Sequence, residues 1–162
     1  KRWTFEGLAE CVDYGESIGI KSTVENPLYR YPAPLPETIK HMVEVAKEIP
    51  RLGICYDDGN FLSNGEDPLA CLDQIASRVH HSHIKDYKYV DEGYEGSMQL
   101  GSKHVAYAPA GEGLIDFRGI LEKLIQADYR NYLSIEFMGK GQQVKEGTAI
   151  GVKNLRKILK EI

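Results

Sequence analysis

Four titratable side chains of this sequence each stand at the end of a short, mostly apolar stretch. They are Glu25, Asp57, His83 and Glu136. Each stretch has the length and the alternating or β-branched composition of a strand, which places the four side chains at four strand ends. Three carboxylates and one imidazole brought together need a neutralising cation, because like charges in a pocket of low dielectric constant raise one another's pKa values. The set therefore indicates a site for a divalent cation, on condition that the four strand ends meet.

The donor atoms of this set narrow the choice of cation. An oxygen-rich set with one nitrogen suits Mn²⁺, Mg²⁺ or Co²⁺, and suits Zn²⁺ less uniquely. We expect Mn²⁺, with Mg²⁺, Co²⁺ and Zn²⁺ as alternatives. The three cysteines, Cys11, Cys55 and Cys71, show neither a C-x-x-C pair nor the Cys/His spacing of a zinc finger. Their odd number and spacing indicate reduced thiols in a cytoplasmic protein.

The clearest of the four strands is the stretch from Val79 to Ile84. A period of two places His81 and His83 on one face of it. We expect His83, at the carboxyl end, to be the ligand and His81 to pack in the interior. Lys85 and Asp86 follow directly, and they have two interpretations, a local ion pair or the anchor of a loop.

The elements that must position these side chains alternate along the chain. Strands are predicted over residues 20–25, 52–57, 79–84 and 131–136. Helices are predicted over residues 4–18, 37–49 and 144–159, after the N-cap residue Asp67 and after the N-cap residue Asp116. The order strand, helix, strand implies a parallel sheet. Polar residues at consecutive strand ends imply a curved sheet, as in a barrel.

Three connections between these elements have a composition of their own. Residues 28–36 hold three prolines and are predicted to be a stiff loop. Asp58-Gly59-Asn60 is predicted to be a turn. Residues 87–113 contain tyrosines and glycines with little periodicity, which is typical of a long loop that covers a site as a lid.

The bulk composition excludes several classes of protein. The chain has 162 residues, of which 42% are hydrophobic, enough for the core of one globular domain. Its net charge is −4 and it has no long basic run, so nucleic acid is not an expected partner. No apolar run approaches the roughly 20 residues that span a bilayer, so no membrane association is expected.

Five motifs, in this order and spacing, resemble the xylose isomerase-like TIM barrels of the sugar phosphate isomerase/epimerase type. The motifs are Val24-Glu25-Asn26, Gly53-Ile54-Cys55-Tyr56-Asp57-Asp58-Gly59-Asn60, His83-Ile84-Lys85-Asp86, Gly111-Glu112-Gly113-Leu114-Ile115-Asp116 and Leu133-Ser134-Ile135-Glu136. That group includes ketose 3-epimerases, hydroxypyruvate isomerases and inosose dehydratases. The resemblance covers only strands five to eight of a (β/α)8 barrel, which needs about 250 residues. It implies that residues 1–162 are one domain, the C-terminal half of a TIM barrel.

The resemblance also implies a mechanism in carbohydrate metabolism. Glu25, Asp57, His83 and Glu136 would be the metal ligands. Glu25 and Glu136 would in addition be the catalytic acid/base pair, which passes a proton through an enediolate of a sugar or polyol. The implied activity is that of an isomerase or epimerase. A dehydratase or other lyase that uses the same site is the alternative.

Three further residues are expected to bind substrate. Asn60 stands where epimerases of this type tend to carry a histidine, and Lys85 could contact a hydroxyl, a carboxylate or a phosphate. His104, in the expected lid, is a second candidate contact.

Two less favoured functions remain. An endonuclease IV-like phosphodiesterase needs more ligands, and Ser102-Lys103-His104 lacks the aspartate of that branch's Asp-x-His pair. A non-catalytic half-barrel that serves as a partner subunit is the other. Half a barrel leaves two open sheet edges and an uncovered interior that we expect to be apolar. We therefore expect an N-terminal half on the same chain, with another chain or a homo-oligomer as alternatives.

Overall fold

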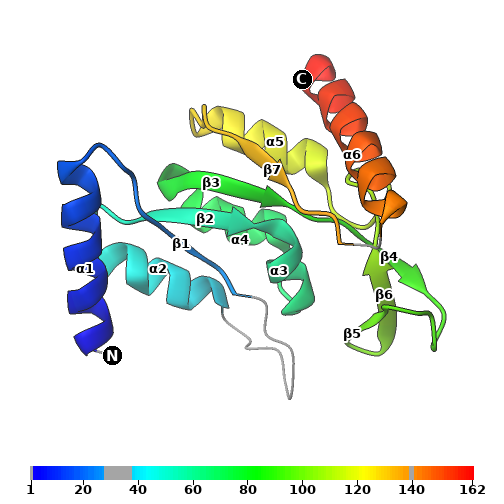
Figure 1. Ribbon diagram of the computed structural model, residues 1–162, viewed down its shortest axis with the longest axis horizontal. Coiled ribbons are helices and arrows are strands. Elements are labelled where there is room, and N and C mark those ends of the chain that lie inside the picture. The colour runs from blue at the N-terminus through cyan, green and yellow to red at the C-terminus, as the bar shows by residue number, and fades with distance from the viewer. Residues whose placement is uncertain (1, 28–37, 139–140) are drawn as a thin grey trace.

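Two sheets organise the chain. A computed structural model describes residues 2–27, 38–138 and 141–162 (Figure 1). A four-stranded parallel sheet has the order β1 (Thr23–Glu25), β2 (Gly53–Asp57), β3 (Val79–Ile84) and β7 (Leu133–Ile135). A three-stranded antiparallel sheet has the order β4 (Tyr87–Val90), β6 (Lys103–Tyr107) and β5 (Met98–Leu100). The parallel sheet places its strands in the order in which they occur in the chain, as one wall of a barrel does.

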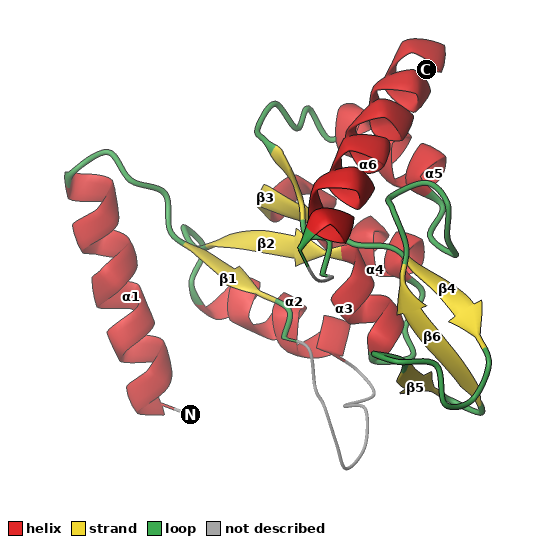
Figure 2. Ribbon diagram, turned by 45° about the vertical axis from the view of Figure 1, so that its right-hand side comes forward, coloured by secondary structure: helices red, strands yellow, loops and turns green. Residues whose placement is uncertain are grey.

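Helices connect the parallel strands, and one further helix lies before β1 and another after β7. They are α1 (Arg2–Ser17), α2 (Thr38–Glu48), α3 (Asp58–Ser63), α4 (Pro68–Ile75), α5 (Phe117–Gln126) and α6 (Gln142–Glu161), with a 3₁₀ turn at Ala76–Arg78. Figure 2 shows α1 at one end of the molecule and the antiparallel sheet at the other. No helix among the described residues is both long and apolar enough to cross a bilayer.

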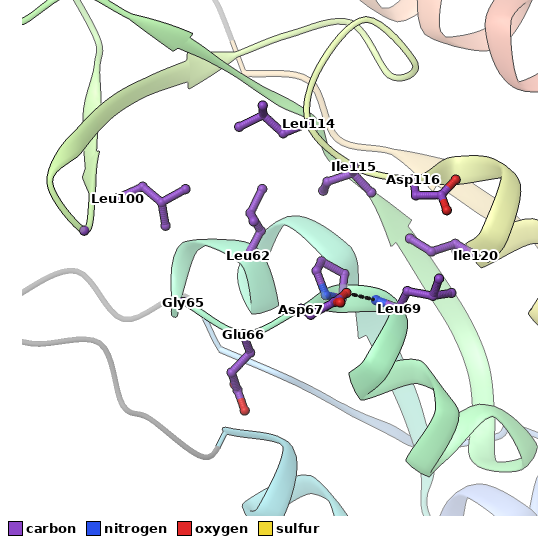
Figure 3. A pocket seen from close by; sticks show the side chains of 12 residues that line it. Leu62, Gly65, Glu66, Asp67, Leu69, Leu100, Leu114, Ile115, Asp116 and Ile120 are labelled. Atoms are coloured by element: carbon purple, nitrogen blue, oxygen red, sulfur yellow. Dashed lines mark hydrogen bonds between the residues drawn. The ribbon is translucent and has the colours of Figure 1, made fainter.

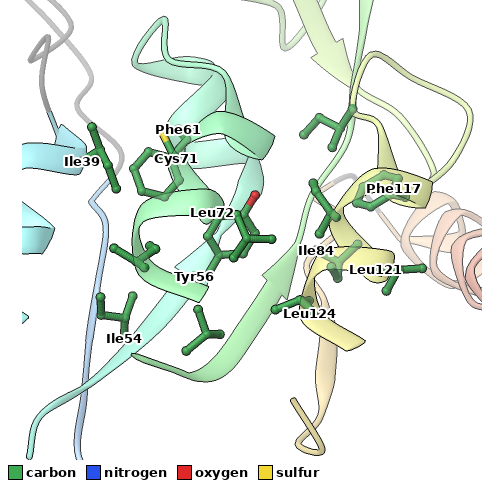
Figure 4. Close-up of a cluster of buried hydrophobic side chains, with 14 of the residues drawn as sticks. Ile39, Ile54, Tyr56, Phe61, Cys71, Leu72, Ile84, Phe117, Leu121 and Leu124 are labelled. Atoms are coloured by element: carbon green, nitrogen blue, oxygen red, sulfur yellow. The ribbon is translucent and has the colours of Figure 1, made fainter. Parts of the chain in front are cut away.

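One hydrophobic core lies between the parallel sheet and α2, α4 and α5. Alternation along β2 turns Ile54 and Tyr56 toward the helices, where both are 0% exposed. Ile84 of β3 joins them, together with Leu72 of α4 and Leu124 of α5 (Figure 4). Burying a side chain of this size contributes about 1.5–3 kcal/mol each. This core therefore fixes the position of the parallel strands relative to the helices.

The opposite face of the sheet is polar. Cys55, His81 and Ser134 lie there, and His81 Nε2 is 3.0 Å from Ser134 Oγ. The ring of His81 packs edge-on against the ring of His83, with centroids 5.2 Å apart. The expectation of an apolar interior is therefore wrong for the described residues, whereas the expected packing role of His81 agrees with these contacts.

Most predicted elements are present, some with shorter bounds. Asp67 and Asp116 cap α4 and α5 as predicted, and their carboxylates accept from backbone N–H groups one turn into each helix. The strands predicted over residues 20–25 and 131–136 are three residues long in the structure. The loop predicted over residues 28–36 lies outside the described residues.

Two connections differ from their predictions. Asp58-Gly59-Asn60 is not a turn but the first turn of α3, because the side chain of Asp57 caps it by accepting from Asn60 N at 2.9 Å. Residues 87–113 are not irregular throughout, since residues 87–107 contain the three strands of the antiparallel sheet, and their role as a lid stays a prediction. Tyr87 and Tyr107 pair across β4 and β6, and their rings, tilted by 36°, have centroids 4.9 Å apart.

Asp86 is the anchor of the loop that precedes α5. Its carboxylate is 2% exposed and accepts from five backbone N–H groups at 2.8–3.2 Å. The donors are Tyr87, Gly111, Gly113, Leu114 and Ile115. A side chain at position 113 would collide with this carboxylate, because a Cβ there would lie 2.2 Å from Asp86 Oδ1. Asp86 is thus a loop anchor, which agrees with the structural interpretation of Lys85-Asp86, and the ion pairs of Lys85 are with Asp57 and Glu136 rather than with Asp86.

Candidate metal centre

The four residues singled out in the sequence converge at one edge of the parallel sheet. Glu25, Asp57 and His83 lie at the carboxyl ends of β1, β2 and β3, and Glu136 follows β7. One ligand atom from each lies within 4.8 Å of the others. The parallel register brings them together, since Asp57 pairs with His83 across β2 and β3.

His83 Nδ1 is the point on which the three carboxylates converge. It lies 3.1 Å from Glu25 Oε1, 3.4 Å from Glu136 Oε2 and 3.6 Å from Asp57 Oδ2. Asp57 and then Glu25 raise the pKa of His83 to about 9, against the opposing effect of burial. The negative potential at this position therefore favours a cation.

Lys85 supplies a buried positive charge beside this point. Its ammonium is 2.7 Å from Asp57 Oδ2, 3.1 Å from Asn60 Oδ1 and 3.2 Å from Glu136 Oε2. An ammonium has three N–H donors, so these three acceptors use them all. Burial disfavours the charged form, but Asp57 and Glu136 outweigh it and raise the pKa of Lys85. Lys85 therefore stays charged and fixes two of the carboxylates.

Asp57 is the most rigid member of the cluster. Its side chain is 0% exposed and is tied to the first turn of α3 through Asn60 N. Asn26 clamps its backbone from β1, with Nδ2 donating to Asp57 O and Oδ1 accepting from Asp57 N, both at 2.8 Å. Burial opposes ionisation of Asp57, yet His83 and Lys85 outweigh it and lower its pKa. This carboxylate is therefore held in place and ionised.

The two glutamates are more accessible. The side chains of Glu25 and Glu136 are 40% and 42% exposed. Burial and then the neighbouring Asp57 raise the pKa of Glu25. Glu25 and Glu136 come from the outermost strands of the sheet, so they flank Asp57 and His83 from two sides.

The residues of this cluster fit a divalent cation. Three carboxylates and one buried ammonium leave a net charge of two negative units when His83 is neutral. A divalent cation would balance that charge, and the carboxylate oxygens and imidazole nitrogen are donors that Mn²⁺ and Mg²⁺ accept. The accessible side chains of Glu25, His83 and Glu136 leave a route by which an ion could enter.

The predicted substrate contacts lie in different places. Asn60 is 3% exposed and donates through Nδ2 to Asn26 O at 2.9 Å and to Glu25 Oε1 at 3.3 Å, so both ends of its amide are engaged. His104 pairs with Val90 and Gln99 in the antiparallel sheet. No hydrogen bond or ion pair within the described ranges joins His104 to the cluster.

Sequence reasoning missed the clamp that Asn26 makes on Asp57. The only local signal was an amide directly after a predicted strand, and nothing in the sequence names its partner. The sequence analysis considered Lys85 as a substrate contact and did not foresee its contacts with the carboxylates of Asp57 and Glu136. The position of Cys55 beside Glu25 and His83 was not foreseen either.

A separate cavity of about 630 Å³ lies away from this cluster. Its lining comes from the end of α3, the start of α4, the turn between β5 and β6 and the start of α5 (Figure 3). Leu62, Leu69, Leu100 and Ile120 make it largely apolar. None of the four cluster residues lines it.

The family match covers almost the whole chain, and the curated relatives match just over half of it. A family model described as "Xylose isomerase-like TIM barrel" matches residues 1–158. Among curated proteins, the inosose dehydratase of Geobacillus kaustophilus is 32% identical over 108 residues, which are 59% of this chain and 35% of that protein. The inosose dehydratase of Lacticaseibacillus casei is 28% identical over 90 residues, which are 53% of this chain and 30% of that protein.

Solved structures have the same fold. A xylose isomerase-like TIM barrel protein from Mycobacterium smegmatis, in complex with magnesium, superimposes with a TM-score of 0.69 at 20% identity. That match covers 98% of this chain and 49% of the solved chain. A D-tagatose 3-epimerase-like protein gives a TM-score of 0.67 at 24% identity, over 97% of this chain and 55% of its own. The chain thus has the fold of a partial TIM barrel and spans about half the length of these solved relatives.

Proposed function

The chain belongs to the xylose isomerase-like TIM barrel family, and from this premise we propose that it carries the metal centre and both proton-transfer groups of a sugar or polyol isomerase or epimerase. The observation that carries the proposal is the convergence of Glu25, Asp57 and Glu136 on His83 Nδ1. Support comes from the combination of an imidazole whose pKa is strongly raised by charged partners with two carboxylates that remain accessible, a pattern typical of functional sites.

The cation has one role in this proposal. Held by Glu25, Asp57, His83 and Glu136, it would polarise a substrate carbonyl and stabilise the negative charge that develops on the oxygen. Mn²⁺ is the proposed ion. Support for a divalent cation comes from the donor set and from the magnesium in the Mycobacterium smegmatis relative.

Glu25 and Glu136 are the proposed proton carriers. They reach the site from opposite edges of the sheet, so a substrate between them would meet one carboxylate on each face. One glutamate would remove the proton from the carbon beside the carbonyl, giving an enediolate, and the other would return a proton. Asp57, buried and ionised, is suited to be a ligand rather than a proton carrier.

We propose that Lys85 and Asn60 position the carboxylates of the metal centre. Lys85 holds Asp57 and Glu136, and Asn60 lies between Lys85 and Glu25. A direct contact of either with substrate would require it to release one of these partners. Their role in substrate binding, and that of His104, stays a prediction.

A second half of the barrel completes the proposal. β1 and β7 are the two edges of the parallel sheet within the described residues, and each presents unpaired backbone groups. We propose that strands one to four, on the same chain, close the barrel on these edges. The mass of the intact natural protein tests this, because a product close to 18.2 kDa would contradict it.

Proton exchange is the direct test of the reaction class. The intact protein, loaded with Mn²⁺, would be incubated in D₂O with a panel of ketoses, inososes and hydroxypyruvate. We expect deuterium at the carbon beside the carbonyl of the true substrate, detected by mass spectrometry, and an isomer or epimer as product. Absence of exchange with the entire panel would contradict the proposal.

Dehydration is a second candidate, and the curated relatives favour it, since those named above are inosose dehydratases. A dehydratase would remove the same proton but expel a neighbouring hydroxyl as water. The same experiment separates the two reactions, because a dehydratase gives a product 18 Da lighter than its substrate, the mass of one water molecule, whereas an isomerase or epimerase keeps the substrate's composition apart from the exchanged deuterium.

A further inference from the structure

Cys55 lies in the polar interior beside two of the proposed ligands. It is on β2, two residues before Asp57, and is 5% exposed. Its Sγ atom, one carboxylate oxygen of Glu25 and one ring nitrogen of His83 lie within 4.8 Å of one another. Glu25 is its partner in the parallel register, so the backbone fixes this proximity.

These three atoms form a ligand set of a different chemical type. A thiolate, an imidazole and a carboxylate are the donors that Zn²⁺ takes in proteins, at about 2.3 Å for sulfur and about 2.0–2.2 Å for nitrogen and oxygen. Closing from their present spacing to those distances requires small side-chain movements. Glu25 and His83 can make them, because their side chains are 40% and 26% exposed.

We propose that Cys55, Glu25 and His83 form a second ligand set, which takes a thiophilic divalent cation such as Zn²⁺ or Cd²⁺ in place of the ion held by the oxygen-rich set. The two sets share Glu25 and His83, so only one can be filled at a time. The thiol proton passes to solvent when the sulfur binds the cation. Mn²⁺ and Mg²⁺ prefer oxygen donors and would stay on the carboxylates.

The surroundings of Cys55 argue against a redox role for this thiol. Burial, followed by the charges of Glu25, Asp57 and Glu136, raises its pKa to about 12. A thiol with so high a pKa is a poor nucleophile at neutral pH. Burial is the main cause of this shift, and the neighbouring carboxylates that add to it are also groups that would attract a metal ion.

Cys71 provides a matched control within the chain. It is similarly buried, at 4% exposed, and burial raises its pKa to about 12 as well. It lies on α4, in the core on the helix side of the sheet (Figure 4). No described group that could hold a metal includes it.

The consequence for activity rests on the proposed function. A cation on the thiolate set would engage Glu25, one of the two proposed proton carriers, and would withdraw it from substrate. Zn²⁺ or Cd²⁺ would therefore inhibit the Mn²⁺-loaded protein. Binding itself does not depend on the proposed reaction.

Cadmium spectroscopy tests the ligand set directly. Cd²⁺ would be titrated into the intact protein and its Cys55→Ser and Cys71→Ser variants, with circular dichroism to verify folding. We expect a sulfur-to-cadmium charge-transfer band in the ultraviolet for the wild type and Cys71→Ser, and its loss in Cys55→Ser. We also expect Cys55→Ser to weaken Cd²⁺ binding by roughly 10–100-fold in calorimetry. Identical spectra for the wild type and Cys55→Ser would overturn the inference.

The outcomes separate this inference from the proposed function. A wild type that turns over with Mn²⁺ but shows no cadmium–sulfur band contradicts the thiolate set alone. A wild type that shows the band but exchanges no substrate proton contradicts the proposed function alone.

Discussion

The carboxylates of the candidate metal centre and the carboxylate of Asp86 lie at the same end of the parallel sheet, but they have opposite kinds of partner. Asp57 and Glu136 face side chains, chiefly His83 and Lys85. Asp86 is surrounded by five backbone N–H groups. The residues Lys85 and Asp86 are adjacent in sequence, yet one belongs to each region.

The difference separates a carboxylate that can exchange its partner from one that cannot. Backbone N–H groups are fixed by the fold, so removing Asp86 would leave several donors unsatisfied at once. Side-chain partners can move, and accessible carboxylates can replace them with an ion or a substrate. A strand-end carboxylate is therefore a functional candidate when its partners are titratable side chains, and a structural one when the backbone saturates it.

The largest expected effect is on turnover, from Glu136→Gln. The amide keeps the shape of the carboxylate but cannot accept a proton, so we expect turnover to fall by about 1,000-fold or more, while the fold is retained. Steady-state kinetics and circular dichroism measure the two effects. Glu112→Gln, at an exposed loop position, is the control and should leave turnover unchanged. Full activity of Glu136→Gln would contradict a functional role for the carboxylates that have titratable side chains as partners.

Asp86→Ala should have the largest effect on stability. Five backbone donors lose their acceptor, and we expect the free energy of unfolding to fall by roughly 3 kcal/mol or more, allowing for water that reaches some of them. Urea denaturation measures this change. A loss below about 0.5 kcal/mol would show that water replaces the carboxylate and that Asp86 is not an anchor.

Removal of the metal should cause an intermediate loss of stability, which depends on the ligands of the candidate metal centre and not on Asp86. At a free Mn²⁺ concentration about 100 times the dissociation constant, the ion stabilises the fold by about 2.7 kcal/mol. A chelator should lower the melting temperature of the wild type accordingly. The same chelator should leave the melting temperature of Glu25→Gln/Glu136→Gln almost unchanged. An equal shift in both proteins would place the ion elsewhere.

The smallest expected effect is the loss of stability in Asp116→Ala, which tests whether the number of backbone donors determines how much a carboxylate stabilises the fold. Asp116 also accepts from the backbone, but only from Gly119 N, at 3.0 Å. Asp116→Ala should therefore destabilise by about 1 kcal/mol, as the loss of a helix N-cap does. Equal losses for Asp116→Ala and Asp86→Ala in urea denaturation would mean that the number of backbone donors does not set the cost.

The fold class and the family were predictable because their signals are local and repeated. Alternating or β-branched stretches marked the four parallel strands, and the aspartates before α4 and α5 were identified as caps. The convergence of Glu25, Asp57, His83 and Glu136 was also predictable, because parallel strands in sequential order bring their carboxyl ends together. Their catalytic and ligand roles stay predictions.

From the amino-acid sequence alone one can predict which residues end each strand, which faces they share and that three carboxylates gathered there form a candidate cation site. The interaction partners depend on the three-dimensional arrangement: Lys85 binds Asp57 rather than Asp86, Asn26 clamps Asp57, and three strands within residues 87–107 pair as a sheet. Periodicity and helix capping involve residues only a few positions apart, so they can be read directly from the sequence. The partner of a buried polar group is chosen across 25 or more residues by the register of the strands and the need to satisfy every buried donor and acceptor.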